Sequence, residues 1–287
     1  MLKLPVILEM FWSKLFEPLE YTLSGILVSD VGRKRTENQD NFSFGEFVNE
    51  NKSNSIRLEI QKVTLPQAYA IMDGMGGEKL GAQASLEAAG FFSDIKKDIL
   101  EVLPKLDIKG REKVFTSLIH SLNEKVCQMA LENNVKQSGT TIVSIFFVEN
   151  RAYIVSVGDS QIFLIRNGEA IRQNELDTMN VTIVENGVEK QIKGGISQFL
   201  GMDAIEYELV PHIVDVKLKE GDTFLLCSDG LTDYVSPEEI GAIIHNASCA
   251  KSIDYLLSLA MERGGKDNTT IIRLDVKAKG TESTVSK

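Results

Sequence analysis

Residues 68–77 have the sequence AYAIMDGMGG, in which an apolar run turns at Asp73 into a glycine-rich segment. The unbroken small and apolar residues over 68–72 predict a buried strand that ends at Asp73. Two helices are expected next along the chain, because apolar residues recur there at every third or fourth position. The two stripes are Leu80, Ala84, Ala88, Phe91, Ile95 and Ile99, then Val114, Leu118, Leu122, Val126 and Met129.

Strands are predicted on both sides of this helix pair. Before it, 25–30 is expected to be a short strand, and 42–48 and 56–63 are expected to form a hairpin around a polar turn. After it, mostly β-branched and aromatic residues predict strands over 141–148, 153–157, 161–165, 214–218, 223–227 and 270–275. More helices are expected between the last two strands, with a capping box at Ser236, Pro237 and Glu239 and a glycine stop at Gly264 and Gly265.

The order of these elements predicts the fold class. Strands, two helices, many strands, two helices and a last strand do not follow the regular alternation of a doubly wound parallel sheet. The chain is therefore expected to be α+β. A four-layer α-β-β-α sandwich, with two packed, mainly antiparallel sheets flanked by helix pairs, buries the apolar faces of both sheets.

Composition narrows the class of protein. The chain has 287 residues, of which 43% are hydrophobic and 25% charged, and this suits a globular protein with a substantial core. The formal net charge of −10 argues against a nucleic-acid partner and suits a protein that collects divalent cations. Three separated cysteines without a CxxC pair fit a reducing cytoplasm and exclude a zinc ribbon. The three histidines lie near none of the aspartate motifs below, so any metal is expected to have oxygen ligands.

The first residues include an apolar run, 4–12, that is interrupted by Pro5 and Glu9. This run is too short and too broken to cross a membrane, and it carries no small-residue cleavage site. We therefore expect no membrane association and no signal peptide here. The preferred interpretation is an amphipathic helix that packs on the domain, with Trp12 as its anchor.

Five aspartates share one local setting, beside a predicted strand end and close to glycine or small polar residues. They are Asp40 in RTENQD (35–40), Asp73 in DGMGG (73–77), Asp159 in GDS (158–160), Asp229 in SDG (228–230) and Asp267 in GGKDNTT (264–270). A single Asp-Gly after a strand is usually an ordinary turn. Five of them favour a set of carboxylates on a rigid frame, whose mutual repulsion a divalent cation relieves.

Such a site suits the hydrolysis of phosphate esters. Two hard cations roughly 3.5–4 Å apart can clamp a phosphoryl group and ionise a bridging water at neutral pH. Arg35 is the candidate for holding the phosphate, because its planar guanidinium matches phosphate oxygens. The alternative is a solvated surface arginine, since Arg33 and Lys34 are adjacent and equally basic.

Six motifs together resemble the metal-dependent protein phosphatases of type 2C, in their bacterial form. In chain order they are SDVGRKRTENQDNF (29–42), AIMDGMGG (70–77), SGTT (138–141), VGDSQIFLIRNG (157–168), LLCSDGLTDYV (225–235) and GGKDNTT (264–270). The resemblance extends from about residue 24 to about residue 277 and agrees in order, spacing and residue type. No single motif would carry it alone.

The resemblance implies a serine/threonine protein phosphatase that uses direct attack by a hydroxide bridging two Mn²⁺ or Mg²⁺ ions. By similarity, Asp73 bridges the two metals, the Gly74 carbonyl binds one of them, and Asp229 and Asp267 bind the other. Asp40 orients metal-bound water and Arg35 holds the substrate phosphate. In this similarity Asp159 binds a weaker third metal together with Asp229, and Asn268 supports Asp267.

Three positions depart from the family pattern. Gln39 stands where many relatives have an acidic residue, which alters a water-mediated metal contact. Met75 stands where some relatives have a histidine proposed as general acid, so the leaving-group proton must have another source. Residues 174–180, NELDTMN, lack the usual LTxDH-like pattern, which puts substrate selection in doubt.

These expectations define a domain plan and three competing functions. Residues 1–20 are expected to be an N-terminal extension, 21–278 the catalytic domain and 279–287 a polar tail. We expect a cytoplasmic monomer that acts on phosphoproteins and works with a serine/threonine kinase. The alternatives are a pseudophosphatase that binds a phosphoprotein or kinase without turnover, and a phosphatase that serves one regulatory partner. Thr140 and Thr141 are expected to be strand residues beside the site, and Cys227 a buried small hydrophobe.

Overall fold

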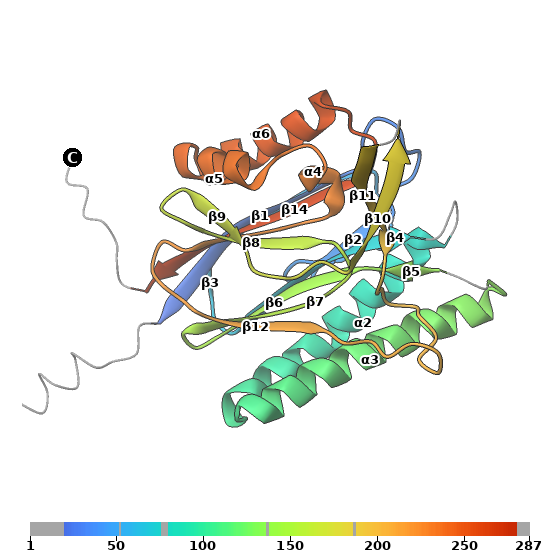
Figure 1. Ribbon diagram of the computed structural model, residues 1–287. Helices are drawn as coiled ribbons and strands as arrows, with labels where there is room; N and C mark the ends of the chain where they lie inside the picture. Colours follow the sequence, from blue (N-terminus) through green and yellow to red (C-terminus); the bar gives the residue numbers. More distant parts are fainter. Residues whose placement is uncertain (1–19, 52, 76–79, 136–137, 186–187, 280–287) are drawn as a thin grey trace, which may run out of the picture.

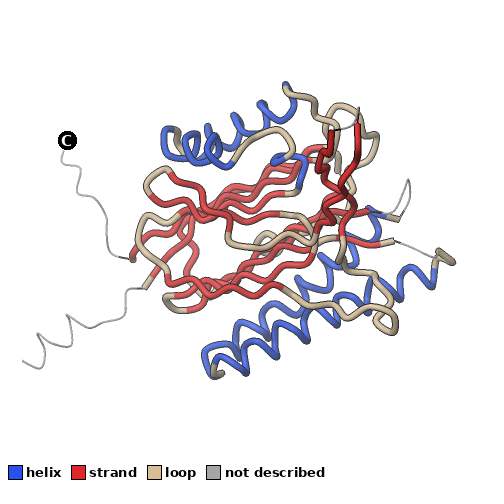
Figure 2. The backbone as a smooth tube through the Cα atoms, in the orientation of Figure 1, coloured by secondary structure: helices blue, strands red, loops and turns tan. Residues whose placement is uncertain are grey.

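Two antiparallel sheets lie face to face between two groups of helices (Figure 1). The computed structural model describes residues 20–51, 53–75, 80–135, 138–185 and 188–279. The layer order is helix pair, sheet, sheet, helix pair, as the blue and red segments of Figure 2 show. The predicted α+β sandwich is therefore confirmed.

Each sheet has an order that differs from the order of its strands in the chain. The first sheet contains, from edge to edge, β3 (Ser55–Thr64), β1 (Tyr21–Asp30), β14 (Thr269–Ala278), β13 (Thr223–Cys227), β8 (Gln161–Arg166) and β9 (Glu169–Arg172). The second contains β12 (His212–Lys217), β7 (Arg151–Val157), β6 (Ile142–Val148), β4 (Gln67–Met75) and β2 (Asp40–Ser43), with β5 (Gly139–Thr140) paired to β4. A separate hairpin consists of β10 (Thr178–Glu185) and β11 (Val188–Ile196).

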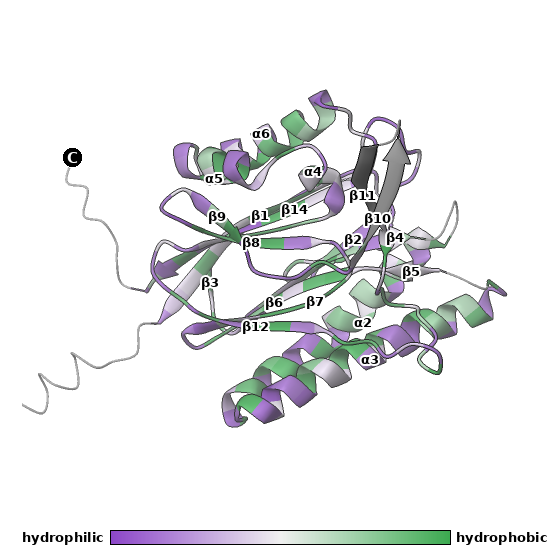
Figure 3. Cartoon of the chain, in the orientation of Figure 1, coloured by the Kyte–Doolittle hydropathy of each residue, from purple (hydrophilic) through white to green (hydrophobic). Residues whose placement is uncertain are grey.

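The helices cover the outer faces of the sheets. One side carries α2 (Gly81–Val102), the 3-10 turn η1 (Leu103–Lys105) and α3 (Ile108–Glu132), and the other carries α4 (Asp229–Thr232), α5 (Pro237–Asn246) and α6 (Cys249–Glu262). In Figure 3, α2, α3, α5 and α6 show both hydrophobic and hydrophilic bands. This is the pattern of helices with one face on a core and one in solvent.

Three apolar cores follow from the alternation of side chains along the strands. In β4, Ala68, Ala70 and Met72 pack towards α2 and α3, whereas Tyr69 and Ile71 pack between the two sheets. Successive residues of a strand point to opposite faces, so one strand serves two cores. A third core joins the first sheet to α5 and α6. Strands buried on both faces explain why the apolar runs in the sequence are continuous rather than alternating.

The predicted helix signals are confirmed on the second helix pair. The Ser236 side chain accepts from the Glu239 backbone N–H, and the Glu239 side chain accepts from the Ser236 N–H, with Pro237 in the first turn. Gly264 and Gly265 follow the end of α6 with positive φ values of 158° and 54°. Glycine adopts the latter without a steric penalty, so this pair ends the helix.

The predicted hairpin of 42–48 with 56–63 is wrong. The strand β2 pairs with β4 in one sheet, whereas β3 pairs with β1 in the other. The chain leaves β2 because the side chain of Asn41 accepts from the backbone of Asn49, and the side chain of Asn49 accepts from Ser53, which folds the intervening residues into a crossing loop. Two polar-flanked apolar segments adjacent in sequence do not have to pair with each other.

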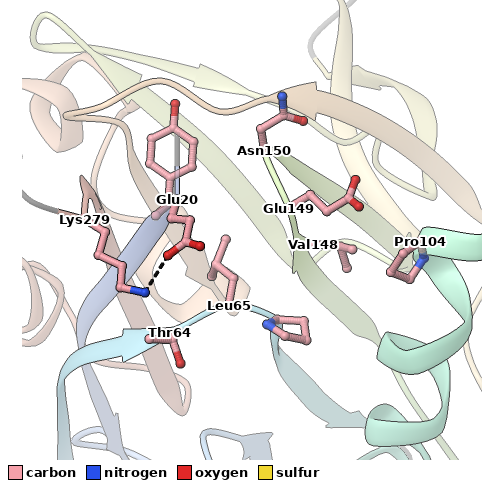
Figure 4. A pocket seen from close by; sticks show the side chains of 10 residues that line it. Glu20, Thr64, Leu65, Pro104, Val148, Glu149, Asn150 and Lys279 are labelled. Carbon is pink, nitrogen blue, oxygen red and sulfur yellow. Dashed lines mark hydrogen bonds and ion pairs between the residues drawn. The ribbon is translucent and has the colours of Figure 1, made fainter. Parts of the chain in front are cut away.

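A pocket of about 650 Å³ opens at the end of the sandwich where β1 and β4 begin and β14 ends (Figure 4). Its walls include Tyr21, Leu65 and Pro66, with Glu20 and Lys279 at the rim. The aspartates lie at the other ends of these strands, so this pocket is remote from the predicted chemistry. Among the described residues, no helix is long and apolar enough to cross a membrane.

Candidate metal and phosphate site

Strand ends bring four of the five predicted aspartates to one end of the sandwich. Asp40 begins β2 and is the direct cross-strand partner of Asp73, which lies near the end of β4. Asp229 follows β13 and begins α4, and Asp267 lies two residues before the start of β14. Since β13 and β14 are antiparallel neighbours, the end of one lies beside the start of the other. Asp73 belongs to β4 itself, which continues to Met75 rather than ending at the aspartate.

Asp40 is a buried carboxylate, only 1% exposed. Its Oδ2 accepts hydrogen bonds from Ser228 Oγ at 2.8 Å and from Thr270 Oγ1 at 2.7 Å. Its Oδ1 is buried and accepts no hydrogen bond from the described residues. Burial raises the pKa of Asp40 to about 7, the two hydroxyl donors oppose the shift, and the charges of Asp229 and Asp267 add to it.

A chain of hydroxyl groups holds Asp40 in place. Thr270 Oγ1 lies 2.8 Å from Ser29 Oγ, which in turn accepts from Asn38 Nδ2 at 2.9 Å. Because Thr270 gives its one proton to Asp40, Ser29 donates to Thr270. Ser228 and Thr270 lie inside motifs that the sequence singled out, but only the structure shows that both support Asp40.

Asp73 is coupled to every other aspartate of the set. Burial and then the charges of Asp40, Asp229, Asp159 and Asp267 raise its pKa well above its usual value. Thr141 holds the backbone of Asp73 from both sides: its Oγ1 accepts from Asp73 N at 3.1 Å, and its N–H donates to Asp73 O at 2.9 Å. The predicted threonines therefore lie beside the site, although only Thr140 belongs to a strand, β5.

Gly74 lies where the chain is too crowded for a side chain. An added Cβ would be 2.2 Å from the Gly81 carbonyl oxygen and 2.6 Å from that of Gln39. The Gln39 carbonyl also accepts from Gly74 N at 3.2 Å and from Ser85 Oγ at 2.6 Å. The backbone of Gln39 thus joins β4 to the start of α2. The last two residues of the DGMGG motif lie outside the described residues.

Asp159 lies in the turn after β7 and is 2% exposed. The turn is held to Asp73 through Thr141, because Thr141 Oγ1 is 2.7 Å from Ser160 Oγ. Gly158 has a φ of 105°, and a Cβ there would lie 2.7 Å from the Thr141 side chain. Glycine is therefore required for the close approach of this turn to β4.

Arg35 and Asn268 organise the rim of the site. Arg35 Nη2 donates to Asp267 Oδ2 at 2.8 Å, with side chains 50% and 40% exposed. This bond and the charges of Asp73 and Asp229 raise the pKa of Arg35. Asn268 Oδ1 accepts from Gln39 N at 2.8 Å, and its Nδ2 donates to the carbonyls of Val31 and Glu37. Asn268 thereby fixes the loop that carries Arg35.

The aspartate cluster has a basic partner, because Arg35 binds Asp267. Burial and the charges of neighbouring aspartates still raise the pKa of Asp40 and of Asp73. In the described part of the chain, no three His, Cys, Asp or Glu side chains converge closely enough to form a closed metal-ligand set. The aspartates lie around a common region and are grouped by electrostatic coupling rather than by contact. Carboxylate oxygens, including the buried Asp40 Oδ1, are the donors that Mg²⁺ and Mn²⁺ prefer.

One histidine lies closer to the site than its sequence position indicates. His212 Nε2 is 2.9 Å from Asp177 Oδ1, and Asp177 Oδ2 accepts from the backbone N–H of Gly158 at 2.8 Å. Asp177 belongs to the segment 174–180, which departs from the family pattern. The separation of 35 residues between Asp177 and His212 leaves no local signal that could have predicted this contact.

Comparisons with known proteins agree with this geometry. The family model described as protein phosphatase 2C matches residues 60–267. The serine/threonine protein phosphatase PstP of Mycobacterium tuberculosis is 32% identical over 213 residues, which are 72% of this chain and 40% of PstP. The protein phosphatase PhpP of Streptococcus pneumoniae is 30% identical over 89% of this chain and 98% of its own length. The chain therefore spans well under half of PstP and nearly all of PhpP.

A solved structure supports the fold. The catalytic domain of PstP, in complex with two manganese ions, superposes with a TM-score of 0.67 at 26% identity. The superposition covers 90% of this chain and 99% of that domain. The family model, the curated relatives and the fold lead to the same conclusion, which is that this chain belongs to the protein phosphatase 2C family.

Proposed function

We propose that this chain is a serine/threonine protein phosphatase that hydrolyses phosphoserine and phosphothreonine in other proteins and depends on Mn²⁺ or Mg²⁺. The observation that carries the proposal is the convergence of aspartates from separate segments on Asp73, whose pKa the other four raise after burial, with Arg35 bound to Asp267 at the rim. Family membership supports the reaction class, and the two manganese ions of the PstP domain support the choice of cation.

The proposal assigns metal-binding roles to five positions, and Asp40 acts through the metal-bound water. Asp73 would bridge two cations, the Gly74 carbonyl would bind one of them, and Asp229 and Asp267 would bind the other. Asp159 with Asp229 would hold a weaker third cation. When bound, the cations would neutralise the charge of the phosphate and lower the pKa of water, which would suit direct attack of water on phosphorus without a phosphoenzyme.

Asp40 and Arg35 would act on water and on phosphate. Hydroxyl donors fix Asp40 Oδ2, so Oδ1 is the atom available to accept a hydrogen bond from the attacking water. Nearby cations favour the ionised form of Asp40, which suits it to this acceptor role. The Arg35 guanidinium is half exposed and has donors beyond the one given to Asp267, so it can bind phosphate oxygens from the rim.

The proposal also includes the domain plan, the location and the partners of the protein. We infer that residues 21–278 form the catalytic domain and that the protein works in the cytoplasm as a monomer, on phosphoproteins and opposite a serine/threonine kinase. Neither nucleic acid nor membrane is an expected partner. The N-terminal extension, 1–20, and its anchor Trp12 lie almost entirely outside the described residues, and so does most of the tail, 279–287.

The test is turnover of a phosphothreonine peptide by metal-stripped protein, with Mn²⁺, Mg²⁺, Ca²⁺ or nothing added back. We expect Mn²⁺ or Mg²⁺ to restore phosphate release and a chelator to abolish it. An exposed aspartate of α2 offers a control for loss of charge. Asp94→Asn removes one negative charge far from the site and should leave metal-dependent turnover unchanged. Metal binding by calorimetry without turnover under any cation would instead favour a pseudophosphatase.

A further inference from the structure

A buried carboxylate outside the predicted metal set connects the site to the β10–β11 hairpin. Asp177, directly before β10, is 6% exposed. Its Oδ1 accepts from Gln198 Nε2 at 2.7 Å and from His212 Nε2 at 2.9 Å, and its Oδ2 accepts from Gly158 N at 2.8 Å. The three donors come from different segments of the chain, so this buried carboxylate joins the three segments through hydrogen bonds.

The backbone of Asp177 strengthens the same junction. Its N–H donates to the Gly158 carbonyl at 3.0 Å, and its carbonyl accepts from Ser197 N at 2.8 Å. Ser197 follows β11 directly, and Thr178 pairs with Ile196 at the base of the hairpin. The first strand of the hairpin therefore starts next to Asp177, and the residue after its second strand is hydrogen-bonded to Asp177. Asp177 is also hydrogen-bonded to the turn that carries Asp159.

The orientation of the hairpin depends on the contacts at its base. Its two strands pair with each other and with neither large sheet in the described part of the chain. In Figure 1 it stands at the end of the molecule where β4 and β5 end and α4 begins, which is the end that holds the aspartates. A two-stranded hairpin alone has little intrinsic stability, so contacts at its base determine where it points.

His212 and Gln198 extend the junction along the connection to β12. Gln198 Oε1 accepts from Val210 N at 2.9 Å, so this side chain joins both ends of the connection. His212 begins β12 and is held in the second sheet opposite Ser156. The imidazole thus links the hairpin base to a rigid strand, while its Nδ1 faces the exposed Glu175 carboxylate at 4.0 Å.

We propose that Asp177, held by His212 and Gln198, is a positioning residue that sets the hairpin against the aspartate site and thereby governs the docking of folded phosphoproteins. On this proposal a folded phosphoprotein contacts the hairpin as it docks because of its size, whereas a small phosphate ester does not. The inference rests on the proposed function for its catalytic readout only.

The experiment compares His212→Leu with His212→Gln, because glutamine keeps a side-chain N–H that can donate to Asp177. The substrates are p-nitrophenyl phosphate and an autophosphorylated serine/threonine kinase domain, both assayed in Mn²⁺. We expect His212→Leu to raise the KM for the kinase domain about tenfold, as loss of one hydrogen bond to a charge predicts, with kcat unchanged. Both constants for p-nitrophenyl phosphate should stay within about twofold, and His212→Gln should restore the KM.

A second readout does not require activity. Hydrogen exchange of peptides covering β10 and β11 should accelerate in His212→Leu and return to normal in His212→Gln. His120→Leu is the matched control, since His120 contacts the same connection at the Leu209 carbonyl but not Asp177. Asp177→Asn places an amide N–H opposite the N–H donors that the carboxylate accepts from. It should therefore raise the KM for the kinase domain and accelerate hydrogen exchange more than His212→Leu does.

The outcomes separate the two proposals. A wild-type protein that cleaves neither substrate refutes the phosphatase function, and hydrogen exchange alone then decides the positioning role. Unchanged exchange in His212→Leu overturns the inference. So does an equal loss on both substrates, because a general loss of activity would mark His212 as merely structural or as part of the chemistry.

Discussion

The two ends of the sandwich treat a buried aspartate in opposite ways. At the end where β8 finishes and β13 begins, Asp222 is 2% exposed. Its carboxylate accepts hydrogen bonds from Arg166 Nε at 2.7 Å and from Arg166 Nη2 at 2.8 Å. The Lys219 N–H adds a third donor at 2.8 Å. At the other end, Asp40 is equally buried but has only hydroxyl donors, and neighbouring aspartates raise its pKa further.

The difference separates structural charge from functional charge. The Arg166–Asp222 pair is bidentate and complete within the protein, so it stabilises the fold and has no capacity left to bind a ligand. The aspartate end has more negative charge than its one arginine neutralises, and the folded chain keeps that imbalance. Clusters whose charge is not balanced internally are where perturbed pKa values indicate function.

Asp73→Asn should have the largest effect on the function of the aspartate end. It removes the carboxylate to which all the others couple, so we expect phosphatase activity to fall roughly a thousandfold. The metal-free protein should unfold at the same or a higher temperature, because one source of repulsion is gone. Steady-state kinetics and a thermal melt measure the two effects, and near-normal kcat would remove Asp73 from the metal assignment.

Arg166→Met should destabilise the opposite end of the sandwich without changing catalysis. It leaves the Asp222 carboxylate buried without its counter-ion, and we expect a loss on the order of 3 kcal/mol in the free energy of unfolding. Arg151→Met is the control, because Arg151 and Asp215 form an exposed pair that should contribute about 1 kcal/mol or less. Urea denaturation gives both values. A change in kcat per folded molecule would contradict the division between the two ends.

Stability of the metal-free protein should fall as the pH rises from about 4 towards 7. The pKa of Asp40 is about 7 in the folded chain against an ordinary value of 3.8, so the folded state binds more protons than the unfolded state in this window. We expect a loss on the order of 2 kcal/mol across it, with Asp73 contributing in the same direction. Urea midpoints at several pH values test the sign. Asp40→Asn should flatten the profile.

Ser156→Ala should have the smallest effect, although it lies opposite His212 in the same sheet. Its hydroxyl is buried and forms no hydrogen bond with the described residues. Replacing an unpartnered buried polar group by an apolar one should change the free energy of unfolding by less than about 0.5 kcal/mol or raise it slightly. A larger loss in a thermal melt would reveal a partner for this serine.

Much of the fold could be predicted from the sequence because its signals are local. The apolar stripes of α2 and α3, the capping box at Ser236 and the glycines after α6 depend on residues a few positions apart. The wrong hairpin shows the limit of such signals. Whether β3 pairs with β2 or with β1 depends on contacts between segments far apart in the chain, and β1 pairs with both β3 and β14.

The candidate residues of the site follow from local motifs in the sequence, whereas the contacts that support them do not. Asp40, Asp73, Asp159, Asp229 and Asp267 carry recognisable motifs, and the structure couples them electrostatically. The ion pair of Arg35 with Asp267 joins residues 232 positions apart, and no pattern along the chain announces it. The hairpin β10–β11 was not predicted, because residues 178–196 mix apolar with polar and glycine residues and contain no long apolar run.

The central claim is that divalent cations complete the charge of the aspartate end. Thermal unfolding of metal-stripped protein at pH 7.5, with and without Mn²⁺, tests it most directly, alongside Asp73→Asn under the same conditions. We predict that Mn²⁺ raises the Tm of the wild type in a concentration-dependent way and leaves the variant nearly unchanged. An unchanged Tm in the wild type, or equal shifts in both proteins, would contradict the claim.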